Sequence, residues 1–170
     1  LDEYRSMLAR LADPRRTPEA DADQIIPLAK PVYWATGAIH SPETGSPEML
    51  MELVYRLAVD ESAFFETIRN NVIVLITPVV ETDGRAKQVD LHMAPRRDPN
   101  ADVSSRLLFW GRYVAHDNNR DGMALSLKLM QNVMRTYLDW NPTVFHDLHE
   151  SATYLYTSTG RGPYNPNIDP

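Results

Sequence analysis

The chain has 170 residues, and 43% of them are apolar, which is enough to bury one hydrophobic core. Its formal net charge is −6 and its basic residues are scattered, which argues against a phosphate-binding surface and a nucleic-acid partner. It contains no cysteine, which excludes disulfides and thiolate metal sites and leaves His, Asp and Glu as metal ligands.

The two ends of the sequence predict an excised piece. The chain starts at Leu1 instead of methionine and stops in the coil-like run "GPYNPNIDP". No apolar run is long enough to span a bilayer, and the first residues lack the charged-then-apolar order of a signal peptide. We expect one domain over residues 1–170, secreted or periplasmic after loss of a signal peptide, with a cytoplasmic location as the alternative.

Periodicity and start signals predict helices along most of the chain. Thr17 is the expected N-cap of one, with Pro18 in its first turn, and another begins at Ser46 with Pro47 at its first position. The last helix ends before Asn141–Pro142. The predicted helices span residues 1–13, 17–29, 46–57, 61–70 and 123–140. The expected core face of the last helix consists of Met123, Leu127, Met130, Met134 and Tyr137.

Runs of β-branched and aromatic residues predict three strands between these helices. They span residues 32–36, 72–80 and 143–148. The second is apolar on both faces, as is typical of a strand covered by helices on both sides of a parallel sheet. Between Glu81 and His116 the chain is polar and aperiodic, which predicts a long loop region. The order of elements indicates an α/β fold with a mostly parallel or mixed central sheet flanked by helices.

Two of the predicted strands run into a histidine. His40 follows the first strand and His149 follows the third. Because α/β sheets bind ligands outside the carboxyl ends of their strands, we expect these two side chains to share a site. Glu43 lies three residues after His40 in a turn shaped by Pro42. Two ligands from one loop and one from a distant strand predict a catalytic Zn²⁺ site with its fourth position left to water.

Four motifs occur in order along most of the chain: "HSPETGSPEM", "TPVVETDGR", "HDNNRDG" and "FHDLHES". Together, from Pro31 to Ser151, they resemble the zinc carboxypeptidase (M14 metallopeptidase) family. The resemblance implies a phosphorylase/hydrolase-like α/β fold, a peptide or protein substrate, and His40, Glu43 and His149 as the zinc ligands. The wording "VAHDNNRD" is similar to that of large bacterial members.

The resemblance also implies substrate-binding residues. The family's Asn-Arg pair, which holds the terminal carboxylate of the substrate, falls on Asn119 and Arg120. A guanidinium suits this role because it grips a carboxylate through two parallel charge-assisted bonds. A further family arginine polarises the scissile carbonyl, and Arg96 or Arg97 lies in the corresponding interval.

The chain departs from the family pattern at two places. "SPETGSPE" replaces the small-residue run that commonly follows the first histidine. Family members take their general base, a glutamate, and a substrate-contacting tyrosine from well downstream of the last ligand, and nothing follows Pro170. We therefore expect the N-terminal part of a catalytic domain, incomplete at its C-terminus and inactive alone. Glu150 adjoins the ligand His149 but falls on the opposite face of a strand, so it is not assigned as the base.

The remaining histidines and acids have simpler interpretations. On a strand, His146 points away from the face of His149, although on a helix the two would share a face. His92 and His116 fall in the polar region as solvated or turn residues. Asp147 either orients a ligand imidazole or is only a strand-end acid.

A rival interpretation of "DNNRDG" is a calcium loop. Asp117, Asn119, Asp121 and Gly122 match the opening of an EF-hand, but its twelfth position requires a glutamate and here is Lys128. Arg120 has an alternative as well, as a structural ion-pair partner of Asp117 or Asp121.

Two further functions are consistent with the same sequence motifs. One is a zinc amidohydrolase of the aspartoacylase or succinylglutamate desuccinylase type, which would cleave N-acyl amino acids. The other is a non-catalytic, metallopeptidase-like module that binds peptide termini through Arg120. The oligomeric state is not predicted.

Overall fold

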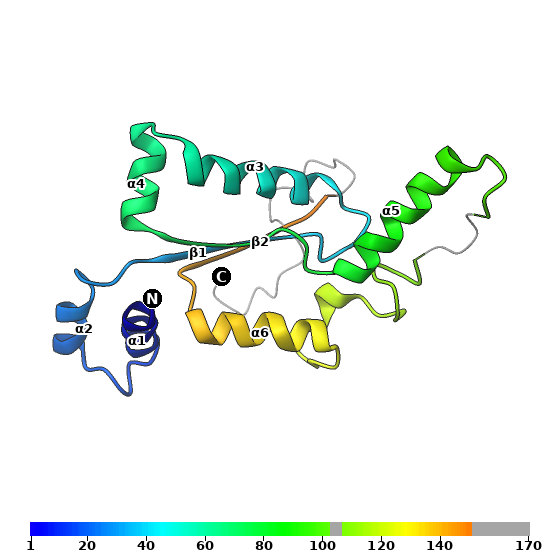
Figure 1. The fold of residues 1–170 in the computed structure, drawn as a ribbon. Helices are drawn as coiled ribbons and strands as arrows, with labels where there is room; N and C mark the ends of the chain where they lie inside the picture. Colours follow the sequence, from blue (N-terminus) through cyan, green and yellow to red (C-terminus); the bar gives the residue numbers. More distant parts are fainter. Residues whose placement is uncertain (103–106, 151–170) are drawn as a thin grey trace, which may run out of the picture.

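The computed structural model describes residues 1–102 and 107–150. In this part of the chain, helices and strands alternate as the sequence predicted, so the fold is α/β (Figure 1). The helices are α1 (Asp2–Leu11), α2 (Glu19–Ile25), α3 (Gly45–Val59), α4 (Ala63–Asn71), α5 (Thr82–Arg97), the 3-10 helix η1 (Asn118–Arg120) and α6 (Lys128–Trp140). The strands are β1 (Val32–Gly37), β2 (Ile73–Thr77) and β3 (Val144–Leu148).

The described strands form a parallel sheet in the order β2-β1-β3. Trp34 of β1 is paired with Leu75 of β2 and with Phe145 of β3. β1 is the most deeply buried strand because it has neighbours on both edges, and Val32, Trp34 and other residues along it are almost inaccessible. β2, predicted over residues 72–80, is shorter than expected and only partly buried at the sheet edge.

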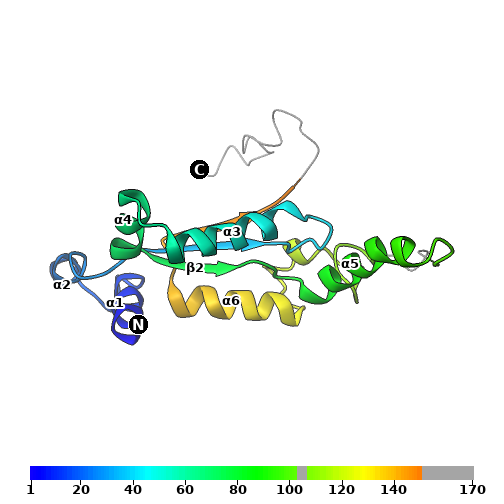
Figure 2. The ribbon, with the colours of Figure 1, turned by 45° about the horizontal axis from the view of Figure 1, so that its top comes forward.

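Helices cover both faces of the sheet. α3 and α4 lie on one face, and α6, with α1 packed beside it, lies on the other (Figures 1 and 2). Leu50 of α3 is fully buried and Met130 of α6 nearly so, so each layer contributes to the core. The two N-terminal helices are shorter than predicted, and α2 begins after Pro18 instead of after the expected cap Thr17.

The predicted long loop between Glu81 and His116 is wrong in its first half, because residues 82–97 form α5. This helix extends away from the sheet and buries only Gly84 (Figure 1). A helix that packs little surface against the core needs no apolar stripe, so its sequence carries no helical period. Pro95 lies inside the last turn of α5, where it has no N–H to donate to the carbonyl oxygen of Leu91.

The predicted start of the last helix is also wrong. α6 begins at Lys128 instead of at Met123, whose side chain is 99% exposed. The carboxylate of Asp121 accepts the backbone N–H groups of Ser126 (3.2 Å) and Leu127 (2.8 Å) and so holds the preceding residues in a turn. The predicted end is confirmed, since α6 stops at Trp140 and Asn141 takes a left-handed conformation with φ of 44°.

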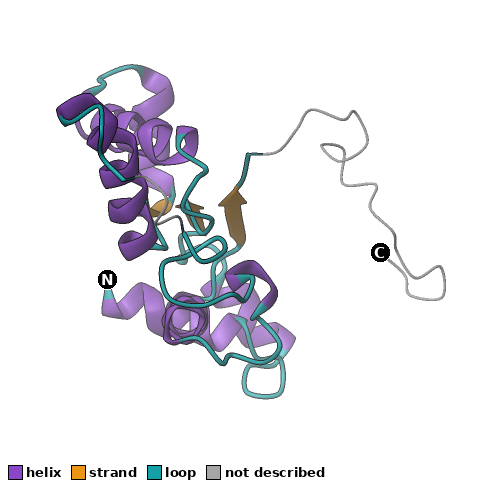
Figure 3. Ribbon diagram, turned by 90° about the vertical axis from the view of Figure 1, so that its right-hand side faces the viewer, coloured by secondary structure: helices purple, strands orange, loops and turns teal. Residues whose placement is uncertain are grey.

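The carboxyl ends of the strands point to one side of the molecule. Figure 3 looks toward that side and shows loops gathered between the two helical layers. One of these loops connects β1 to α3, one connects β2 to α5, and the third, residues 107–117, precedes η1. No helix in the described ranges is long and apolar enough to cross a membrane. The coil predicted from Thr157 lies outside the described residues.

Candidate metal centre

The loop that carries His40 is held in a tight turn directly after β1. Gly37 lets other backbone approach closely, since a Cβ atom there would lie 3.0 Å from the carbonyl oxygen of Pro78 and 3.0 Å from Ser46 Oγ. Ala38 is fully buried with φ of 47°, an uncommon conformation for a residue with a side chain. Strained residues of this kind concentrate at functional sites, and this one lies two residues before His40.

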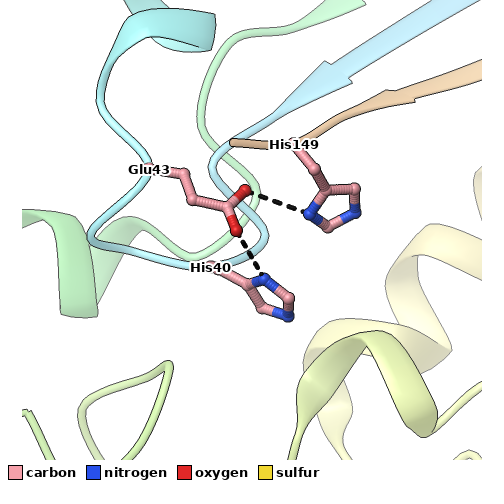
Figure 4. A group of neighbouring side chains, drawn as sticks. All are labelled: His40, Glu43 and His149. Atoms are coloured by element: carbon pink, nitrogen blue, oxygen red, sulfur yellow. Dashed lines mark hydrogen bonds and ion pairs between the residues drawn. The ribbon is translucent and has the colours of Figure 1, made fainter. Parts of the chain in front are cut away.

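His40, Glu43 and His149 converge at the carboxyl ends of β1 and β3 (Figure 4). Glu43 Oε1 lies 2.8 Å from His40 Nδ1, and Glu43 Oε2 lies 3.0 Å from His149 Nδ1. One ligand atom from each residue lies within 4.8 Å of the others. A tetrahedral zinc site with bonds of about 2.1 Å places its ligand atoms about 3.4 Å apart, so three atoms within 4.8 Å of one another could hold one zinc ion.

The hydrogen bonds of the two imidazoles also favour a cation. Each ring meets a carboxylate at both nitrogens: His40 Nε2 lies 3.0 Å from Asp117 Oδ1, and His149 Nε2 lies 2.7 Å from Asp147 Oδ2. A neutral imidazole has one N–H and so satisfies only one of its two carboxylates. A cation bound by Glu43 and the two Nδ1 atoms removes this shortage, because each Nε2–H then donates to its aspartate, as is usual for metal-binding histidines.

Asp117 was not predicted as a partner of His40. It caps η1 by accepting the N–H of Asn119 (2.9 Å). Burial favours its neutral acid form, but the hydrogen bonds from His40 and Asn119 and the nearby charge of Arg120 outweigh this effect and lower its pKa. Asp117 therefore stays ionised and can hold the outer nitrogen of the His40 ring. The sequence offered one signal for a site role of Asp117, which is that it lies two residues before Asn119, a predicted site residue.

The structure brings Asp147 and Asn119 to His149. Asp147 bridges the outer nitrogen of His149 and the hydroxyl of Thr36, which donates to Asp147 Oδ1 at 2.7 Å. The side-chain amide of Asn119 lies 3.1 Å from His149 Nε2. Asp147 therefore contacts the His149 imidazole, as the first of the two interpretations given for it requires.

The predicted substrate arginines lie in different places. Arg120 is exposed beside Asn119, and its guanidinium makes a long contact of 3.4 Å with the carbonyl oxygen of that residue. Within the described residues, no ion pair joins it to Asp117 or Asp121. Arg96 and Arg97 are exposed in the last turn of α5, about 20 Å along the helix from its first residue, Thr82. The structure does not bring them to the site.

The other histidines lie apart from the three ligands. His146 Nδ1 lies 2.5 Å from the hydroxyl of Tyr33, and His92 is exposed on α5. His116 Nε2 lies 3.1 Å from Asp121 Oδ1. Asp121 is fully buried, and its carboxylate oxygens contact His116, the hydroxyl of Ser126 and the N–H of Leu127. These contacts give Asp121 a structural role and leave its oxygens engaged within the protein, so it does not act as a calcium ligand.

Trp110 is a second residue that the sequence interpretation missed. Its indole stacks on the His40 ring at 4.7 Å between centroids, with 27° between the planes. Its carbonyl oxygen accepts the N–H of Ser41 at 3.0 Å. Because it lies in an aperiodic polar region, no local pattern distinguished it from a surface aromatic residue.

The three candidate ligands do not line the cavity of about 530 Å³ that the structure contains. Glu81, Asn118 and Arg112 line it together with residues of β2 and α6, whereas His40, Glu43 and His149 do not. The group of converging ligands, and not the cavity, therefore identifies the functional site.

An α/β sheet with two imidazoles and a carboxylate converging at its strand ends defines a candidate zinc enzyme. Residues 24–166 match the zinc carboxypeptidase family, M14, and the chain belongs to this zinc-dependent family of metallopeptidases. No curated protein matches the chain significantly, and neither does any solved structure.

Proposed function

We propose that the protein is a zinc-dependent hydrolase of the carboxypeptidase type, which removes residues from the C-terminus of peptides. The observation that carries the proposal is the convergence of His40, Glu43 and His149 within one ligand sphere. When bound there, zinc supplies a Lewis acid that acidifies a water molecule and polarises a carbonyl oxygen. Membership of the zinc carboxypeptidase family supports the same reaction class.

The residues around the ligands would divide the remaining tasks. Asp117 and Asp147 hold the outer nitrogens of the two imidazoles, so the inner nitrogens face Glu43. Arg120 is exposed next to Asn119, which itself lies 3.1 Å from His149. A substrate carboxylate bound by Arg120 would therefore lie close to the metal ligands, as cleavage near a C-terminus requires.

The test is metal analysis of the purified full-length protein combined with substrate profiling. We expect about one zinc per chain, loss of that zinc in His40→Ala, and release of C-terminal residues from unblocked peptides. Cleavage of N-acyl amino acids in place of peptides would instead identify an amidohydrolase. Peptide binding without turnover would identify a non-catalytic module. Full zinc occupancy in His40→Ala would contradict the proposed centre.

A further inference from the structure

Glu81 is a buried acid that lies outside the metal ligands and that the proposed reaction does not use. Its side chain is enclosed where three segments meet: the His40 turn, the start of α5 and the loop at residues 110–112. Its Oε2 atom accepts the hydroxyl of Ser41 at 3.0 Å and the backbone N–H of Arg112 at 3.2 Å. Its own N–H donates to the carbonyl oxygen of Ala38 at 3.1 Å.

These contacts surround His40 on both sides in the chain. Ala38 lies two residues before it and Ser41 one residue after it, so Glu81 binds the turn at both ends. Ser41 also donates its N–H to Trp110, whose indole stacks on the His40 ring. Glu81 thus connects the turn that carries His40 to the loop at residues 110–112, whose Trp110 stacks on the His40 ring.

Two glycines leave room for the Glu81 carboxylate, because a side chain at either position would collide with it. A Cβ atom on Gly84 would lie 2.0 Å from Glu81 Oε2 and 2.0 Å from Ser41 Oγ. A Cβ atom on Gly111 would lie 2.9 Å from the same carboxylate oxygen. Neither residue has a φ in the left-handed region, so the need for glycine there comes from the close approach to Glu81.

We propose that Glu81 is a positioning residue of the metal centre, which sets the orientation of the His40 imidazole toward Glu43 and His149. The inference rests on the proposed zinc function. A buried hydroxyl and a partly buried N–H lose their acceptor when the carboxylate is removed, and unpaired groups of this kind drive local rearrangement. The turn that they hold carries one of the three ligands, so the rearrangement reaches the metal.

The main test is zinc affinity of the full-length protein, measured by competition with a chromophoric chelator. We expect Glu81→Ala to weaken zinc binding by about 10-fold, the lower end of the effect of removing a group hydrogen-bonded to a metal ligand, because Glu81 acts through the turn that carries His40. Glu81→Gln keeps an oxygen that both donors can reach, so it should retain most of the affinity. Glu48→Ala removes a nearby exposed glutamate that is paired with Arg85 and should leave affinity unchanged.

A spectroscopic readout separates positioning from loss of stability. In the cobalt(II)-substituted protein, the visible absorption bands report ligand geometry at saturating metal. We expect these bands to shift in Glu81→Ala and in Gly84→Ala, which displaces the carboxylate without removing it. A purely structural role would lower the unfolding temperature and leave the spectrum of the folded, saturated protein unchanged. If Glu81→Ala does not fold, Ser41→Ala removes one donor without adding volume and serves as the milder variant.

The outcomes distinguish this inference from the proposed function. If the wild-type protein binds zinc and Glu81→Ala binds it equally, with the same cobalt spectrum, the positioning role is wrong and the zinc function stands. If the wild-type protein binds no zinc, the proposed function is wrong and the inference fails with it. Weaker zinc binding in Glu81→Ala, with near wild-type binding in Glu81→Gln, supports both the positioning role and the zinc function.

Discussion

Asp117 Oδ1 lies 3.0 Å from His40 Nε2, on the edge of the ring opposite the nitrogen that faces Glu43. The His40 imidazole thus lies between Glu43, in its own β1–α3 loop, and Asp117, the cap of η1, which is 77 residues after His40 in sequence. The ring cannot rotate without breaking one of these two contacts. The two contacts together restrict the orientation of the ring.

We expect Asp117→Asn to weaken zinc binding by about 10- to 100-fold, because the neutral amide no longer holds the outer N–H of His40 as strongly. Asparagine still caps η1, so the fold should be retained. Chelator competition measures the change. Asp90→Asn on the exposed face of α5 is the matched control, and equal affinities in the two variants would contradict the role given to Asp117.

We expect Glu43→Gln to purify with little or no zinc, since the substitution removes the one anionic ligand and keeps the shape of the side chain. Glu48→Gln, the same change at an exposed site in the first turn of α3, should keep the wild-type zinc content. Elemental analysis of the purified proteins gives the comparison. Wild-type zinc content in Glu43→Gln would show that this carboxylate is not a ligand.

Zinc should stabilise the folded protein, because its ligands come from segments that are far apart in the chain. At free zinc about 100 times the dissociation constant, linkage predicts about 2.7 kcal/mol of stabilisation. For a domain of this size that corresponds to a rise of about 5–10 °C in Tm. Thermal unfolding with and without a chelator measures it. His149→Ala should lose the zinc-dependent rise, whereas His92→Ala should keep it.

Asp121 should contribute to the acid sensitivity of the folded protein. Burial of this carboxyl favours its neutral form, but hydrogen bonds from Ser126, Leu127 and His116 outweigh that effect and lower its pKa from 3.8 to about 2. The unfolded chain therefore takes up the proton first. The stability contributed by Asp121 is complete above about pH 4 and is lost as the pH falls toward 2.

The measurement is the free energy of unfolding from pH 5 to pH 2, followed by circular dichroism in urea. Asp121→Asn should be less stable at pH 5 and should show a flatter dependence on pH than the wild type. Asp90→Asn should follow the wild-type curve. A wild-type slope in Asp121→Asn would mean that other carboxyl groups cause the acid sensitivity.

Arg120→Ala should weaken the use of substrates that end in a free carboxylate. Loss of a charge-assisted hydrogen bond costs about 1.5–3 kcal/mol, which corresponds to about 10- to 150-fold in kcat/KM. The same peptides with an amidated C-terminus should be affected much less. Arg135→Ala, on the exposed face of α6, is the control. Equal losses on free and amidated peptides would contradict a carboxylate-binding role.

Local patterns predicted much of the fold because they report burial. β1, α3 and β3 lie within one or two residues of their predicted bounds, since each has an apolar face or a clear start or stop signal. α5 was missed because it packs little against the core, and burial is what imposes a helical period on a sequence. The start of α6 was misplaced because the buried carboxylate of Asp121 holds residues 121–127 in a turn.

The site residues likewise fall into two groups: those that local sequence patterns identified and those that only the structure showed. His40 and His149 were found because each follows a strand, and the strand topology brings the ends of β1 and β3 together. Asp117, Trp110 and Glu81 were not assigned to the site, because nothing local distinguishes a loop acid or aromatic residue that contacts a ligand from one that faces water. The displacement of Arg96 and Arg97 from the site depends on the direction of α5, which no local pattern encodes.

The sequence by itself determined the α/β class, the zinc carboxypeptidase family and the three candidate ligands, because periodicity and ordered motifs are local and linear properties. Only the tertiary structure decided which residues form hydrogen bonds to those ligands or to the turn that carries His40. Hydrogen bonds such as Asp117 to His40 and Glu81 to Ser41 join positions 77 and 40 residues apart. Such contacts exist only once the sheet has brought its loops to one edge.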